Sequence, residues 1–133
     1  MVRSAVVAGQ FYPGRRESLL KSVSSLMPAD AEQEEAIAIM SPHAGYIYSG
    51  KVAGHTFAGV KIPAEVIILG PNHHGRGHDA AVYPSGAWET PLGKTLISAT
   101  LADRILIECP MAAEDTLAHR FEHSLEVQLP FIQ

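Results

Sequence analysis

Cysteine, positive charge and long apolar runs are all scarce in this sequence. The single cysteine, Cys109, cannot form an internal disulfide, which suits a reducing compartment, so we expect a cytoplasmic protein. Ten lysines and arginines stand against 14 aspartates and glutamates, giving a formal net charge of −4. A protein with this net charge is not expected to have the basic surface that binds nucleic acid or acidic lipid. No apolar run approaches the roughly 20 residues of a membrane-spanning helix, so no membrane partner is expected.

The length and composition indicate one globular domain over residues 1–133. Hydrophobic residues make up 47% of the chain and charged residues 18%, which is ordinary for a folded protein and argues against disorder. A chain of this length is long enough to bury a core.

Two apolar runs are each followed by a proline and then a histidine. Residues 36–40 read Ala-Ile-Ala-Ile-Met and lead to Ser-Pro-His43, and residues 66–69 read Val-Ile-Ile-Leu and lead to Gly-Pro-Asn-His73. Runs without polar alternation are typical of parallel strands that are buried on both faces, and a following proline ends the ladder. The segment between the runs is long enough for a crossover helix. We therefore predict a βαβ unit.

The predicted unit places both histidines at one edge of the sheet. Parallel strands end at the same edge, where ligands bind in open α/β proteins. Strands that are adjacent or next but one lie about 5 to 10 Å apart, which allows His43 and His73 to reach one metal ion. The predicted fold class is α/β, a mostly parallel sheet with helices on both faces.

Two nucleotide-binding patterns are incomplete. Gly45-x-x-x-x-Gly50-Lys51 is followed by Val52, where a phosphate-binding loop needs serine or threonine for magnesium. Gly75-x-Gly77-x-x-Ala80 fits the dinucleotide pattern, but a strand-like stretch follows it and supplies no helix N-terminus for a pyrophosphate. Nucleotide chemistry is therefore not the favoured interpretation.

Residues His119, Glu122 and His123 match the H-x-x-E-H pattern of inverted zinc peptidases. On that interpretation both histidines bind zinc and Glu122 is the general base. The pattern leaves the histidines at the predicted sheet edge unexplained, and no third ligand follows before Gln133. The alternative is an amphipathic helix that carries His123 near its N-terminus.

Five motifs together resemble the MEMO1 family, whose prokaryotic members are called AmmeMemoRadiSam system protein B. They are Gly9-Gln-Phe-Tyr-Pro, Ser41-Pro-His-Ala-Gly-Tyr-Ile-Tyr-Ser-Gly, Leu69-Gly-Pro-Asn-His-His, Thr90-Pro-Leu-Gly and Glu122-His-Ser-Leu-Glu-Val-Gln-Leu-Pro-Phe. The resemblance spans the whole chain. It implies a fold like that of the class III extradiol dioxygenases, which hold non-haem iron with two histidines and a carboxylate.

The resemblance also implies a set of site residues. His43 and His73 match metal positions of the family, and His123 lines the same pocket, so these three are the candidate metal ligands. Tyr46, His74 and Glu122 are candidate pocket residues. No residue is assigned as catalytic. Three neutral imidazoles suit iron, copper or zinc, and the sequence does not choose among them.

The function implied is that of a redox-linked protein or an accessory protein of the AmmeMemoRadiSam system, with AMMECR1-like and radical SAM proteins as partners. The alternatives are an extradiol dioxygenase-type oxidoreductase and the zinc peptidase. Members of the family are longer, so we expect this chain to be an incomplete, N-terminal portion of a MEMO-like domain. Apolar faces left uncovered would favour self-association.

Overall fold

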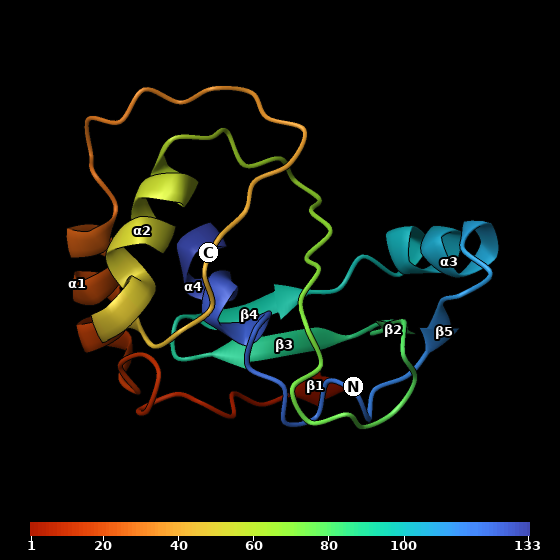
Figure 1. Cartoon of the computed structure of the whole chain (residues 1–133). Helices are drawn as coiled ribbons and strands as arrows, with labels where there is room; N and C mark the ends of the chain where they lie inside the picture. Colours follow the sequence, from red (N-terminus) through yellow and green to blue (C-terminus); the bar gives the residue numbers. More distant parts are fainter.

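The computed structural model describes residues 1–133 and contains helices together with two small sheets (Figure 1). The elements in chain order are β1 (Val2–Arg3), α1 (Arg16–Leu26), α2 (Tyr46–Ala58), β2 (Ala81–Val82), β3 (Ala87–Thr90), β4 (Gly93–Leu96), α3 (Ala99–Glu108), β5 (Ala113–Glu114), the 3-10 helix η1 (Glu126–Gln128) and α4 (Leu129–Ile132). One sheet has the order β1-β3-β4, with β1 parallel and β4 antiparallel to β3. The other pairs β2 with β5 in parallel. Every helix is too short or too polar to serve as a membrane span.

The core lies where α1, α2 and α4 meet, on one side of Figure 1. Leu19 of α1 is fully buried, and Phe57 of α2 stacks on Phe131 of α4 with ring centroids 5.5 Å apart. The end of α1 passes close to Gly54 of α2, where an added Cβ would lie 2.3 Å from the carbonyl oxygen of Leu26. The absence of a side chain at Gly54 therefore allows the two helices to pack.

The two apolar runs that we predicted as strands form no strand. Ile37 and Leu69 are exposed, and no ladder joins residues 36–40 to residues 66–69. A single parallel bridge, between Glu34 and Val60, connects the two segments before the runs begin. A strand needs a neighbour that accepts and donates its backbone hydrogen bonds, and neither run has one. The mixed α/β class is confirmed, but the mostly parallel sheet with helices on both faces is absent, whereas the predicted crossover helix is present as α2.

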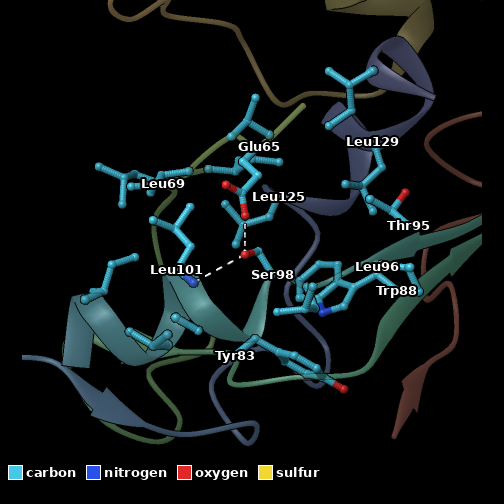
Figure 2. Close-up of a pocket in the computed structure, with 18 of the residues that line it drawn as sticks. Glu65, Leu69, Tyr83, Trp88, Thr95, Leu96, Ser98, Leu101, Leu125 and Leu129 are labelled. Carbon is cyan, nitrogen blue, oxygen red and sulfur yellow. Dashed lines mark hydrogen bonds between the residues drawn. The ribbon is translucent and has the colours of Figure 1, made fainter. Parts of the chain in front are cut away.

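Hollows flank residues 62–69 on two sides. One cavity of about 330 Å³ separates this segment from α3 and from Trp88 of β3 (Figure 2). Another, of about 640 Å³, lies between the segment and residues 36–41. Ser98, at the N-terminus of α3, donates to Glu65 and accepts from the backbone N–H of Leu101. These contacts hold the segment beside α3 without covering its apolar side chains.

A buried ion pair ties the N-terminal strand to the last segment of the chain. Arg3 Nη1 lies 2.7 Å from Oε2 of Glu126, and the two side chains are 6% and 0% exposed. Glu126 also accepts from the backbone N–H groups of Val6 and Val7 and from the hydroxyl of Tyr12. The pair therefore anchors η1 and the residues just before it, which include the candidate site residues Glu122 and His123.

Candidate metal centre

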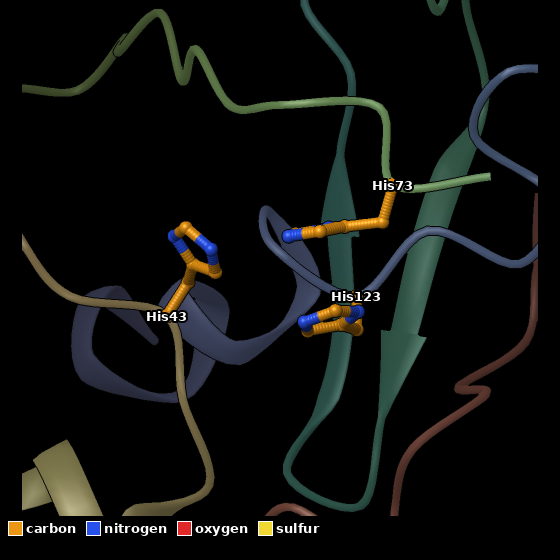
Figure 3. Close-up of side chains that lie close together, drawn as sticks. All are labelled: His43, His73 and His123. Atoms are coloured by element: carbon orange, nitrogen blue, oxygen red, sulfur yellow. The ribbon is translucent and has the colours of Figure 1, made fainter. Parts of the chain in front are cut away.

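The side chains of His43, His73 and His123 converge although their segments are far apart in the sequence (Figure 3). One nitrogen from each ring can be chosen so that all three lie within 4.8 Å of one another. The rings of His73 and His123 stack with centroids 4.6 Å apart, and His43 lies 5.2 Å from His73 and 5.9 Å from His123. Three nitrogens bound to one tetrahedral ion at about 2.1 Å each lie about 3.4 Å apart. From the observed 4.8 Å, a closure of at most about 1.4 Å would allow shared coordination.

The segment 122–128 positions the loop that carries His43. The side-chain nitrogen of Gln128 donates to the carbonyl of Pro42 at 3.1 Å. Tyr46, the first residue of α2, is buried and donates its hydroxyl to the carbonyl of Val127 at 2.7 Å. Burial, together with the nearby carboxylate of Glu126, raises the pKa of Tyr46. The structure thus places Tyr46 in the hydrophobic core.

Glu122 connects the loop of His73 to the segment of His123. Its Oε1 accepts from His73 Nδ1 at 2.9 Å and from the backbone N–H of His123 and Ser124 at 2.8 Å each. Its Oε2 accepts from the backbone N–H of His73 at 2.7 Å. Burial alone would raise the pKa of Glu122, but these hydrogen bonds outweigh it and lower the pKa to about 2. The carboxylate is therefore ionised across the neutral range.

His123 is held neutral by its surroundings. Burial lowers its pKa, the nearby carboxylate of Glu122 raises it, and the other histidines of the cluster lower it further. Phe11 packs against the ring, with centroids 4.6 Å apart. A neutral imidazole keeps a lone pair for a metal ion. The cluster is open to solvent on the side of His73, whose side chain is 40% exposed.

His74 and His119 lie outside the cluster of three. His74 is exposed, and its Nε2 lies 3.0 Å from the carbonyl oxygen of Phe121. His119 is buried between Trp88 and Tyr83, with ring centroids 5.7 Å from each, and its Nε2 lies 3.2 Å from the carbonyl oxygen of Ala81.

The geometry contradicts the zinc-peptidase interpretation. That pattern requires a helix that brings two histidines to one face, whereas residues 119–123 form a turn, bends and irregular backbone, and η1 begins only at Glu126. His119 does not join the group that could hold a metal ion. The predicted amphipathic helix is correspondingly shorter, and His123 precedes it.

The sequence motifs gave no sign of the Arg3–Glu126 pair, which holds the site in place. Arg3 Nε donates to the carbonyl of His119 at 2.7 Å and Arg3 Nη2 to that of Glu122 at 2.5 Å. Arg3 lies in none of the motifs, and Glu126 lies in the motif of residues 122–131 with nothing to indicate its partner. Their pairing across 123 positions is visible only in three dimensions.

Comparison with known proteins identifies the family of the chain. The family model described as "Memo-like protein" matches residues 3–133. A MEMO1 family protein of Pyrococcus furiosus is 47% identical over 138 residues, which cover 100% of this chain and 47% of the relative. One from Aquifex aeolicus is 47% identical over 99% of this chain and 49% of the relative, and one from Thermotoga neapolitana is 40% identical over 100% and 53%. The chain spans about half the length of these curated relatives, and it belongs to the Memo-like, or MEMO1, protein family.

Proposed function

We propose that this protein binds one transition-metal ion through His43, His73 and His123. The observation that carries the proposal is the convergence of three imidazoles from three separate segments, each with a nitrogen within 4.8 Å of the others. Imidazoles gain little from contact with one another, since protonation of one disfavours protonation of the next, and only the ring of His73 hydrogen-bonds a carboxylate. A bound cation would stabilise the convergence of the three rings. Iron, copper and zinc all accept nitrogen ligands of this kind.

We infer a redox-linked or accessory role in the AmmeMemoRadiSam system, with AMMECR1-like and radical SAM proteins as partners, and no extradiol dioxygenase activity. Dioxygenase-type iron sites combine two histidines with a carboxylate ligand. Glu122 is the carboxylate nearest the cluster, and four N–H groups already occupy its two oxygens. It supports His73 and is unsuited to bind the ion. Within these 133 residues the donor set is therefore three imidazoles.

Metal content of protein purified without a histidine tag tests the proposal. We expect a stoichiometry near one ion per chain, and His43→Ala together with His73→Ala should reduce it to background. The matched control is His55→Ala, because His55 is an exposed histidine on α2 that contacts the carbonyl of Lys51 and lies outside the cluster. An unchanged metal content in the double variant would refute the site.

A second assay separates the two roles. The iron-loaded protein is incubated with catechol in air, and the yellow ring-cleavage product is followed by absorbance. We expect no product above the metal-free control. Ring cleavage that disappears in His43→Ala would overturn the accessory role in favour of a dioxygenase.

A further inference from the structure

Glu122 is buried, 3% exposed, at the junction of two segments that each supply a candidate ligand. It bonds both the ring and the backbone of His73, 49 positions earlier in the chain, and the backbone of His123 beside it. Its own carbonyl is fixed by Arg3. The carboxylate is therefore held from several directions and cannot turn away without breaking these bonds.

The chemistry of the contact determines which nitrogen of His73 carries the hydrogen. An ionised carboxylate can only accept hydrogen bonds, so Nδ1 of a neutral His73, at 2.9 Å from Oε1, must be the donor. The lone pair is then on Nε2, on the opposite side of the ring. In Figure 3 this side of His73 points into the space shared with His43 and His123. A carboxylate partner also makes an imidazole a stronger ligand.

The contact is specific to one of the three histidines. The Nδ1 atom of His123 is 3.5 Å from Oε1 of Glu122, which is too long for a useful hydrogen bond. His43 forms no hydrogen bond or ion pair with this carboxylate. The effect of Glu122 on ring orientation is therefore concentrated on His73, the most exposed of the three side chains.

We propose that Glu122 is a positioning residue of the metal centre, which holds His73 in the Nδ1–H form so that Nε2 faces the ion. The inference rests on the metal-binding function proposed above. The competing explanation is that Glu122 only stabilises the contact between the loop of His73 and the segment of His123. That explanation requires a loss of stability when Glu122 is changed, but no change in the tautomer of His73 or in metal affinity of the folded protein.

The first experiment uses the metal-free protein without substitution. Long-range proton–nitrogen NMR of the histidine rings, above their usual pKa of about 6.5, reports the tautomer of each ring. We expect His73 in the Nδ1–H form. Observation of the Nε2–H form would overturn the inference, whether or not the protein binds a metal. Failure of the proposed metal function would appear separately, as a protein with no metal content.

The second experiment compares Glu122→Gln with Glu108→Gln, the same change at an exposed position of α3. One amide oxygen cannot accept all four donors, and the amide group can donate to Nδ1, which favours the Nε2–H form. With Zn²⁺ as the probe in competition with a chromogenic chelator, we expect the Kd of Glu122→Gln to rise about 10- to 100-fold. Glu108→Gln should leave the Kd unchanged. A folded Glu122→Gln protein with an unchanged His73 tautomer and an unchanged Kd for Zn²⁺ would show that Glu122 has only a structural role.

Discussion

Replacing Glu126 by glutamine should cost much of the stability of this protein. The substitution keeps the shape of the side chain but removes its charge and replaces one acceptor oxygen with an NH₂ donor. In the folded chain Glu126 is fully buried and accepts from Arg3, from two backbone N–H groups and from Tyr12. The amide oxygen can serve only some of these donors. The side chain of Arg3, 6% exposed, would lose its counter-charge.

The size of the effect follows from this burial. Removing one partner of a buried ion pair costs about 3–5 kcal/mol because the other charge remains buried and uncompensated. Arg3 keeps two carbonyl acceptors, on His119 and Glu122, so we expect about 3 kcal/mol, the lower end of that range. A domain is stable by only about 5–15 kcal/mol. The variant should therefore unfold at a much lower urea concentration.

Urea unfolding followed by circular dichroism measures the free energy of unfolding directly. The control is Glu108→Gln, which breaks an exposed pair with Arg104 whose side chains are both 68% exposed, and it should cost less than about 1 kcal/mol. If Glu126→Gln costs no more than the control, with a cooperative transition and an unchanged m value, the buried pair does not hold the N-terminal strand to η1 and our reasoning is wrong.

Three further outcomes are expected. Gly54→Ala should destabilise the protein by about 1–3 kcal/mol because its Cβ would meet the Leu26 carbonyl oxygen at 2.3 Å. Gly59→Ala, whose Cβ would have its nearest contact at 3.5 Å, should not destabilise it. Equal urea midpoints for the two variants would contradict this prediction. Burial raises the pKa of Tyr46 in the fold, so only the unfolded chain releases this proton near pH 10. The free energy of unfolding should then fall as the pH rises above about 10, and less so in Tyr46→Phe; equal falls would refute the assignment. Sedimentation should show concentration-dependent self-association that weakens in Ile37→Ser, because Ile37 is fully exposed, and a strictly monomeric wild-type protein would contradict it.

The sequence predicted the histidine cluster better than it predicted the sheet. His43, His73 and His123 lie in local motifs with proline, glycine and serine by which the sequence resembles the MEMO1 family, so the residue type and its immediate turn were both visible. The helix between the first two histidines was also predicted, since the segment between the two apolar runs is long enough for a crossover helix. These features depend on near neighbours in the chain.

The sheet could not be predicted from the same information because pairing depends on distant partners. Residues 36–40 and 66–69 have the composition of buried strands, yet Ile37 and Leu69 are exposed and no strand pairs with either run. Strand propensity describes a fit to a half-buried pleated surface, and that surface has to be supplied by another element. The error in the H-x-x-E-H interpretation has the same origin, since helical spacing indicates a shared face only if the residues are helical.

The prediction of the cluster relied on a sheet edge that the structure lacks. The three histidines still converge because the segment 122–128 positions the loops that carry them. The segment 122–128 reaches the loop of His43 through Gln128, the loop of His73 through Glu122 and Ser124, and the start of α2 through the carbonyl of Val127. Each contact is a hydrogen bond between a side chain and the backbone, which fixes a loop more closely than apolar packing does. Since Arg3 and Glu126 hold this segment in turn, the geometry of the metal centre depends on a buried ion pair whose partners are not themselves ligands. The Glu126→Gln variant should therefore loosen the histidine cluster as well as lower the stability of the fold.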